Sequence, residues 1–336
     1  MIDVPEKRLT RKDFASDQEI RWCPGCGDYA VLSAMQRALA TIGVAPEKTV
    51  IVSGIGCSSR LPYYMNTYGF HTIHGRAPAV ATGLKIARPD LDVWVVTGDG
   101  DGLSIGGNHL LHALRRNVDL NLILFNNEIY GLTKGQYSPT SQPGKVSPST
   151  PMGSLDQPVS PARFALGAGT HFFARGYDVS KRLPELFVRA REHRGSSFVE
   201  VLQNCLVFND GAFGDLKSAE GQIWVEHGEP IVFGENRSKG LRLDTTSLSL
   251  EVVDLEDSAV SIDDIVVHDE TNSTLAWLLA SMRAPHVFGV IYRAPVGTYD
   301  DAVRDQVQEA RRQGASAGDI DAFLRQGYTW RVQNGR

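Results

Sequence analysis

Two short apolar segments, each followed by a polar turn, constrain the fold of this chain most strongly. Residues 92–97 and 120–125 are rich in valine, isoleucine and leucine, which is typical of strands buried in a parallel sheet. The first segment runs into an acidic turn with three glycines, residues 98–102, and the second ends in Asn126 and Asn127. Because a helical segment separates them, the stretch is predicted to be strand, turn, helix, strand and turn.

The polar side chains that follow these two strands predict a metal site. Asp99 and Asp101 supply carboxylates, and Asn126 and Asn127 supply amide oxygens. The carboxyl ends of neighbouring parallel strands meet at one edge of a sheet, where the ligands of open α/β folds gather. Mg²⁺ prefers oxygen ligands and usually keeps substrate phosphates among them. We therefore expect a Mg²⁺-diphosphate site at this edge; the alternative is an ordinary acidic turn with an unrelated asparagine pair.

Strands and helices alternate over the first two thirds of the chain. Further strands are expected at residues 49–53, 170–173 and 198–202, and helices at residues 77–88, 105–116 and 183–193. This alternation predicts an α/β fold with a mostly parallel sheet and helices on both faces. We expect an N-terminal arm at residues 1–20, a main domain at 21–205 and a C-terminal extension at 206–336 that packs on the core or on a partner subunit.

Two further segments are predicted from turn and capping signals. Asp28 is expected to cap a helix whose apolar residues recur at helical spacing as far as Ile42, and Gly43 is expected to end it. Residues 137–161 are rich in serine, proline, threonine and glycine. We expect them to form a long ordered loop, because long loops inside compact domains are usually functional or linkers.

Composition excludes several classes of protein. The chain is 42% hydrophobic and 22% charged, as in ordinary globular proteins, and its net charge of −5 offers no basic surface for nucleic acid. No apolar run reaches the ~20 residues that a membrane helix needs. The first residues lack the apolar core of a signal peptide. We therefore expect a cytoplasmic protein with neither nucleic acid nor membrane as a partner.

The four cysteines are Cys23, Cys26, Cys57 and Cys205. Two disulfides are unusual in a cytosolic chain of this length, whereas four thiolates are the number that holds one iron–sulfur cluster or one structural zinc. Cys23 and Cys26 share one tight turn, and Cys57 and Cys205 follow predicted strands. The four thiols are therefore able to converge on the edge of the sheet where the diphosphate is expected. A [4Fe–4S] cluster, a zinc ion and buried thiols stay open as alternatives.

The chain resembles the β subunits of 2-oxoacid:ferredoxin oxidoreductases, and within them most closely the 2-oxoglutarate:ferredoxin branch. Gly-Asp-Gly followed after somewhat under thirty residues by Asn-Asn resembles the diphosphate motif of thiamine diphosphate enzymes. The resemblance covers residues 20–205 in unbroken order and rests on five motifs, which are residues 22–27, 54–58, 71–76, 97–101 and 126–136.

The resemblance implies a thiamine diphosphate-binding fold that holds thiamine diphosphate, Mg²⁺ and a [4Fe–4S] cluster. It implies that the four cysteines ligate the cluster, and that Asp99, Asn127 and the backbone carbonyl of Ile129 ligate Mg²⁺. It further implies a lining for the organic cofactor made by Ile55, Gly56, Cys57, Ser58, His74, Gly100, Asp101, Leu132 and Thr133.

The same resemblance implies an activity and its partners. A 2-oxoacid would be decarboxylated oxidatively through a thiamine diphosphate adduct, electrons would pass through the cluster to ferredoxin, and coenzyme A would receive the acyl group. Glu128 lies between two expected Mg²⁺ ligands and would face the wrong half of the cofactor. In the family that the chain resembles, the glutamate that activates the cofactor comes from the α subunit. The chain alone is therefore expected to be inactive.

Lys134 and Arg60 are the candidate substrate residues. A fixed cation on either turn would pair with the distal carboxylate of 2-oxoglutarate; the alternative for each is a solvated surface charge. His109 and His112 share one helix face and are expected to be structural. Two other functions stay open at this point: a non-redox thiamine diphosphate decarboxylase or synthase with structural zinc, and a subunit that only transfers electrons. Within the family, a pyruvate-specific enzyme is a further alternative.

Overall fold

The chain is described by a computed structural model that covers residues 8–214, 216–313, 320–330 and 332. Residues 1–7 of the expected N-terminal arm lie outside this range. The rest of that segment contains a short 3₁₀ helix, η1 (Arg11–Phe14), whose Phe14 is fully buried against the core. In the described part of the chain, no helix combines the length and apolar character needed to cross a membrane.

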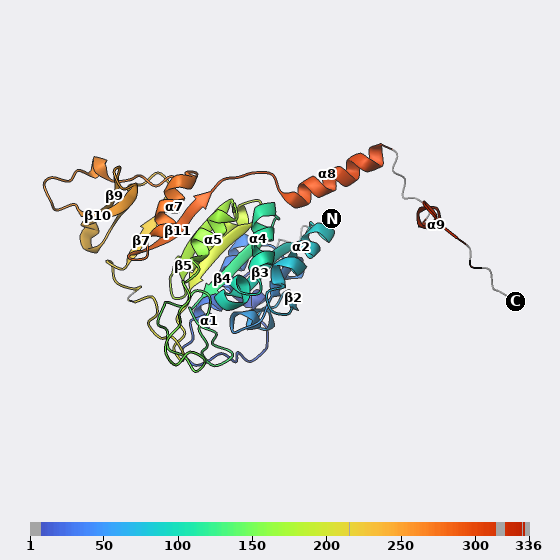
Figure 1. Ribbon diagram of the computed structural model, residues 1–336, viewed down its shortest axis with the longest axis horizontal. Coiled ribbons are helices and arrows are strands. Elements are labelled where there is room, and N and C mark those ends of the chain that lie inside the picture. Colours follow the sequence, from blue (N-terminus) through green and yellow to red (C-terminus); the bar gives the residue numbers. More distant parts are fainter. Residues whose placement is uncertain (1–7, 215, 314–319, 331, 333–336) are drawn as a thin grey trace.

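An eight-stranded sheet forms the centre of the molecule (Figure 1). Its order is β2-β1-β3-β4-β6-β5-β11-β7, and the first six strands are parallel to one another, while β11 and β7 run antiparallel to β5. The mostly parallel α/β fold predicted from the sequence is therefore confirmed. The strands are β1 (Thr49–Ser53), β2 (Tyr68–His71), β3 (Asp92–Gly98), β4 (Asn121–Asn126), β5 (Phe172–Tyr177), β6 (Ser197–Leu202), β7 (Gln222–Val225) and β11 (His286–Arg293).

Helices cover both faces of this sheet. On β3, Val93 and Val95 belong to one hydrophobic cluster, whereas Trp94 and Val96 belong to the other, because successive side chains of a strand point to opposite faces. One face packs on α1 (Asp28–Ile42) and α6 (Leu183–Glu192). The other packs on α2 (Ala77–Ala87), α4 (Gly107–Arg116), α5 (Pro161–Gly167) and α7 (Ser273–Ser281).

The last third of the chain contributes two strands to the main sheet and also forms a second, smaller sheet. β7 and β11 come from this part, yet they complete one end of the sheet. A separate three-stranded sheet lies beside them, with β8 (Val232–Phe233), β9 (Lys239–Asp244) and β10 (Ser249–Asp254). Beyond β11, α8 (Tyr299–Arg312) projects away from the body and is followed by the short α9 (Ile320–Leu324) (Figure 1). The remaining 3₁₀ helices are η2 (Pro46–Lys48), η3 (Ser58–Tyr64), η4 (Glu235–Arg237) and η5 (Ile262–Asp264).

Three local expectations differ from the structure. Asp28 is the first residue of α1 rather than its cap, and Gly27 occupies the capping position. The acidic glycine turn forms a helical turn of its own, α3 (Asp99–Leu103), which begins directly after Gly98, the last residue of β3, in its extended conformation. The short strand predicted at residues 170–173 begins two residues later and is longer, as β5.

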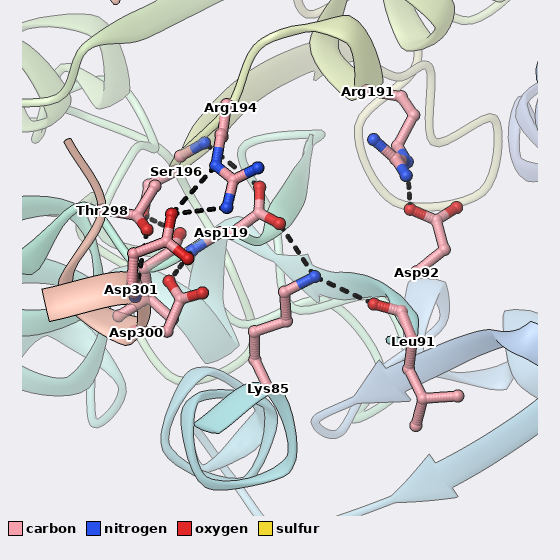
Figure 2. Close-up of polar contacts among 12 residues, drawn as sticks. Lys85, Leu91, Asp92, Asp119, Arg191, Arg194, Ser196, Thr298, Asp300 and Asp301 are labelled. Atoms are coloured by element: carbon pink, nitrogen blue, oxygen red, sulfur yellow. Dashed lines mark hydrogen bonds and ion pairs between the residues drawn. The ribbon is translucent and has the colours of Figure 1, made fainter. Parts of the chain in front are cut away.

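A charged network attaches the beginning of α8 to the sheet (Figure 2). Lys85 Nζ lies 2.8 Å from Asp119 Oδ2, and the backbone nitrogen of Asp119 donates to Asp300 Oδ1 at 3.0 Å. Arg194 pairs with Asp301, and Arg191 pairs with Asp92 at the first residue of β3. This network therefore lies at the amino ends of the strands, opposite the edge where the acidic turn is found.

Candidate functional site

A cavity of about 340 Å³ opens at the carboxyl ends of β1, β3 and β4, and we call it the central cavity. Parallel strands bring the turns that follow them to one edge, so motifs far apart in sequence meet here. Every residue expected to line the organic cofactor borders this cavity, as do the three expected Mg²⁺ ligands: Ile55, Gly56, Cys57, Ser58, His74, Asp99, Gly100, Asp101, Asn127, Ile129, Leu132 and Thr133.

Asp99 is positioned by hydroxyl groups from a distant loop. Its side chain is 2% exposed, and Oδ2 accepts hydrogen bonds from Ser138 Oγ at 2.5 Å and Thr140 Oγ1 at 2.7 Å. Burial raises the pKa of Asp99, and these two hydrogen bonds oppose the shift. The carboxylate is thus held at the cavity wall in one orientation, which suits it to bind a divalent cation.

The turn after β4 sends consecutive side chains in different directions. Asn127 borders the central cavity, whereas Glu128 adopts a left-handed backbone conformation with a φ of 55°. Glu128 borders a second cavity of about 370 Å³ and accepts a hydrogen bond from Gln142 Nε2 at 3.0 Å. Burial raises the pKa of Glu128 to about 7. In the described chain, therefore, this glutamate does not border the cavity where the cofactor is expected.

Asp101 holds two loops together at the cavity. Its Oδ1 accepts from the backbone nitrogens of Ile55 at 3.1 Å and Gly75 at 2.7 Å, and its Oδ2 accepts from Thr97 Oγ1 at 2.7 Å. A Cβ atom at Gly54 would lie 1.8 Å from Oδ2, so only glycine fits there. Asp101 therefore shapes the cavity through the loops at residues 54–58 and 71–76.

Replacing Asp101 with leucine is expected to destabilise the fold. Leucine keeps the approximate size but removes every acceptor, leaving the buried nitrogen of Gly75 and the partly buried nitrogen of Ile55 unpaired at a cost of about 3 kcal/mol or more. The midpoint of thermal unfolding should fall by about 4 °C or more. Asp101→Asn should cost less, because the Thr97 hydroxyl is able to turn and accept from the new amide. Asp90→Leu, at an exposed site, is the control; equal midpoints for Asp101→Leu and this control would contradict the role.

Two buried polar atoms beside the central cavity lack partners in the described chain. They are Ser58 Oγ and Asp28 Oδ2, and both residues border the cavity. Burying an unpaired polar atom is costly, so such atoms usually point to a missing ligand. The Ser58 hydroxyl has a proton to donate to a diphosphate, and Asp99 offers a carboxylate to Mg²⁺ at the same cavity.

The four cysteines border one cavity of about 220 Å³, which we call the cysteine cavity. All four are free thiols. Trp22 Nε1 donates to the carbonyl oxygen of Cys57 at 2.8 Å, which ties the turn carrying Cys23 and Cys26 to the turn after β1. A Cβ atom at Gly131 would lie 3.5 Å from Cys57 Sγ and 3.7 Å from Cys205 Sγ, so the backbone of Gly131 lies close to both sulfurs.

The chemistry of the thiols suits a metal centre. Burial raises the pKa of Cys57 to about 12 and also raises that of Cys26. Thiolate ligands in such a site need the positive charge of a metal centre to stabilise them. Among the described residues, no three His, Cys, Asp or Glu side chains are close enough to hold a single metal ion. The thiols are instead spread around the cysteine cavity.

The two cavities are neighbours. Cys57, Asn127, Gly131 and Leu132 border both of them. Arg60 and Lys134 border the cysteine cavity and are absent from the lining of the central cavity. His109, expected to be structural, contacts Arg76.

Ser138, Thr140 and Gln203 contact expected ligands but do not stand out in the sequence. Ser138 and Thr140 belong to the loop at residues 137–161, whose unusual composition was the available signal. Gln203 carries no motif, and only its position two residues before Cys205 places it near the site.

Comparison with known proteins identifies the family. Residues 54–201 match the C-terminal thiamine diphosphate-binding domain of thiamine diphosphate enzymes. A 2-oxoglutarate oxidoreductase subunit, KorB, from Mycobacterium tuberculosis is 51% identical over 98% of this chain and 90% of its own length. The chain belongs to the β subunits of 2-oxoacid:ferredoxin oxidoreductases. The resemblance predicted from the motifs is therefore confirmed.

Other members of the family extend this result. The β subunit of 2-oxoacid:ferredoxin oxidoreductase 1 from Aeropyrum pernix is 48% identical over 56% of this chain and 60% of its own length. A solved 2-oxoglutarate:ferredoxin oxidoreductase from Magnetococcus marinus, with 2-oxoglutarate, coenzyme A and succinyl-CoA bound, is 34% identical. It superposes with a TM-score of 0.76 over 95% of this chain and 96% of that one. The thiamine diphosphate-binding fold and the oxidoreductase class predicted from the sequence are thus confirmed.

Proposed function

We propose that this chain is the β subunit of a coenzyme A-dependent 2-oxoglutarate:ferredoxin oxidoreductase. The reaction converts 2-oxoglutarate and coenzyme A into succinyl-CoA and CO₂, and its two electrons reduce two ferredoxins. The observation that carries this proposal is the shared wall between the central and cysteine cavities, formed in part by Cys57. A decarboxylation site beside an electron acceptor suits an oxidative reaction. The M. tuberculosis and M. marinus relatives, both named for 2-oxoglutarate, favour this substrate.

Within this proposal the central cavity holds Mg²⁺ and thiamine diphosphate. Asp99, Asn127 and the carbonyl of Ile129 bind the metal, and Ser138 and Thr140 keep the Asp99 carboxylate turned toward it. Ser58, with its unpaired hydroxyl, donates to the diphosphate. When bound, thiamine diphosphate stabilises the carbanion left by CO₂.

The cysteine cavity holds the [4Fe–4S] cluster in this proposal. Cys23, Cys26, Cys57 and Cys205 supply its four thiolate ligands, the number that such clusters require. Free thiols also suit a reducing compartment, which supports a cytoplasmic location. Ferredoxin is the proposed acceptor of the electrons.

The proposal also requires an α subunit. Among the described residues that border the central cavity there is no glutamate, and the carboxylates are Asp28, Asp99 and Asp101. Glu128 faces another cavity. The glutamate that activates the cofactor would therefore come from the α subunit. In this arrangement residues 21–205 form the catalytic domain, and residues 206–336 form an extension whose β7 and β11 complete the sheet.

Lys134 and Arg60 are proposed to bind the distal carboxylate of the substrate. In the described part of the chain neither side chain has a carboxylate partner. Both border the cysteine cavity together with Leu132, which borders the central cavity as well. A cation at this junction would favour a dicarboxylic 2-oxoacid over pyruvate.

The α and β subunits produced together should reduce ferredoxin with 2-oxoglutarate and coenzyme A, and more slowly with pyruvate. Lys134→Ala should raise the KM for 2-oxoglutarate about tenfold, because a charged hydrogen bond is lost, and leave the KM for pyruvate nearly unchanged. Steady-state ferredoxin reduction with each acid measures both effects. Lys181→Ala, another exposed lysine, is the control.

Three results would count against these statements. Equal rises in KM for both acids would remove Lys134 from substrate selection. Faster turnover of pyruvate would replace the proposed substrate with a monoacid. Full decarboxylation by the β subunit alone would show that the α subunit is not needed.

A further inference from the structure

Gln203 connects the two cavities through its side-chain amide. The residue follows β6 directly, is 1% exposed, and its backbone nitrogen donates to the carbonyl oxygen of Asn126 at 2.8 Å. Its Oε1 accepts from Asn127 Nδ2 at 2.7 Å. Its Nε2 donates to Cys26 Sγ at 3.4 Å and to the carbonyl oxygen of Asn204 at 2.7 Å. One side chain therefore contacts an expected Mg²⁺ ligand and an expected cluster ligand.

The contacts determine the orientation of both amides. The carbonyl oxygen of Asn204 is an acceptor only, so the nitrogen of Gln203 must face it and its oxygen must face Asn127. An oxygen in that place accepts only from the nitrogen of Asn127. The Asn127 oxygen is thereby turned away from Gln203, and it accepts from the backbone nitrogen of Ile129 at 3.3 Å. Both N–H donors of the Gln203 amide and one of the two acceptor positions of its oxygen are used.

We propose that Gln203 is a positioning residue that serves both centres at once. It presents the Asn127 oxygen to Mg²⁺, and it donates an N–H···S hydrogen bond to Cys26, a ligand of the cluster. This inference rests on the proposed function, since it requires both centres to be filled. It assigns a role to a residue that borders the cysteine cavity and is absent from the lining of the central cavity.

The hydrogen bond to Cys26 has a predictable electrostatic effect. Reduction adds a negative charge to the cluster, and a hydrogen bond to a ligand sulfur stabilises that charge. The bond therefore favours the reduced cluster and raises its reduction potential. Removing the donor should make the potential more negative, while removing the Oε1 acceptor should leave Asn127 free to rotate and weaken Mg²⁺ binding.

Two variants of Gln203 separate these effects. Gln203→Leu removes the donor and the acceptor. Gln203→Glu removes the donor to Cys26 and keeps an oxygen for Asn127. The test uses the αβ enzyme, with potentials from redox titration followed by electron paramagnetic resonance and Mg²⁺ affinity from titration in the presence of thiamine diphosphate. Gln36→Leu is the matched control, because Gln36 is also buried but lies on α1 and contacts Arg11 and Tyr64 instead.

Gln203→Leu is expected to lower the equilibrium constant for one-electron reduction by up to about tenfold, which corresponds to about 59 mV. It should also weaken Mg²⁺ binding by about tenfold, as second-shell changes at metal sites do. Gln203→Glu should lower the potential at least as far, because it adds a negative charge, but should keep Mg²⁺ affinity within about threefold of the wild type. Gln36→Leu should change neither quantity.

An unchanged potential in a cluster-loaded Gln203→Leu or Gln203→Glu enzyme would overturn the inference. If Gln203→Leu does not assemble, Gln203→Met takes its place, because it removes the same donor without adding a charge: a lowered potential supports the role at Cys26 and an unchanged one refutes it. Iron content and thiamine diphosphate binding of the wild type are measured first. Absence of either would refute the proposed function itself, whereas the comparison of variants tests Gln203 only.

Discussion

Replacing Cys205 with serine is expected to abolish ferredoxin reduction and leave thiamine diphosphate in place. Cys205 borders the cysteine cavity and is absent from the lining of the central cavity. A serine hydroxyl is a poor substitute for a thiolate at iron, so the cluster should not be retained. Mutation of a residue that only supports a metal ligand lowers metal affinity or activity about 10- to 100-fold. Loss of a ligand itself should therefore leave less than about 1% of the ferredoxin-reducing activity.

Iron analysis, visible absorption and electron paramagnetic resonance of the αβ enzyme measure the loss of the cluster. Titration with thiamine diphosphate tests the central cavity. Its affinity for this cofactor should stay within about twofold of that of the wild type. Serine is nearly the same size as cysteine, so the variant tests ligation more than packing. A Cys205→Ser enzyme that kept a complete cluster and its rate would remove this residue from the ligand set.

Asp99→Asn is expected to weaken the binding of Mg²⁺ with thiamine diphosphate and to leave the cluster in place. The carboxylate is buried at the wall of the central cavity and is oriented by Ser138 and Thr140. Mg²⁺ binds carboxylate oxygen far better than a neutral amide. Affinity for Mg²⁺ with thiamine diphosphate should fall by about 100-fold, or ~2.7 kcal/mol, and turnover at ordinary Mg²⁺ concentrations should fall with it.

Calorimetric titration of Mg²⁺ and thiamine diphosphate into the αβ enzyme tests this expectation. The cluster signals of Asp99→Asn should equal those of the wild type, and high Mg²⁺ should restore part of the rate. Ser138→Ala should weaken Mg²⁺ binding less than Asp99→Asn does, because Thr140 still donates to the same oxygen. Normal cofactor affinity in Asp99→Asn would show that the metal is held by other residues.

Together the two variants distinguish this enzyme from the alternatives left open by the sequence. A non-redox thiamine diphosphate enzyme with structural zinc would lose stability, rather than iron signals, on Cys205→Ser. A subunit that only transfers electrons would be indifferent to Asp99→Asn. An enzyme with two separate centres gives a different pattern. Cys205→Ser loses the cluster and keeps thiamine diphosphate, whereas Asp99→Asn loses Mg²⁺ affinity and keeps the cluster.

Much of the fold was predictable because parallel strands leave a strong signal. β3 and β4 are buried on both faces, so nearly all of their residues are apolar and the runs are visible in the sequence. The expected lining of the central cavity was predictable because its motifs follow such strands and parallel strands end at one edge. β7 and β11 were harder to place, since their short runs lie beside the strands of a second small sheet.

The sequence alone determined the α/β class, because local periodicity shows it, and the resemblance of its motifs to a known family implied the cofactor lining that borders the central cavity. Only the tertiary structure decided where neighbouring side chains point. The left-handed conformation of Glu128 turns it into a separate cavity, and Lys134 borders the cysteine cavity instead of the central one. The contacts of Gln203 with Asn127 and Cys26 also belong to this second group. They join residues 76 and 177 positions apart, and no local pattern encodes a hydrogen bond over that separation.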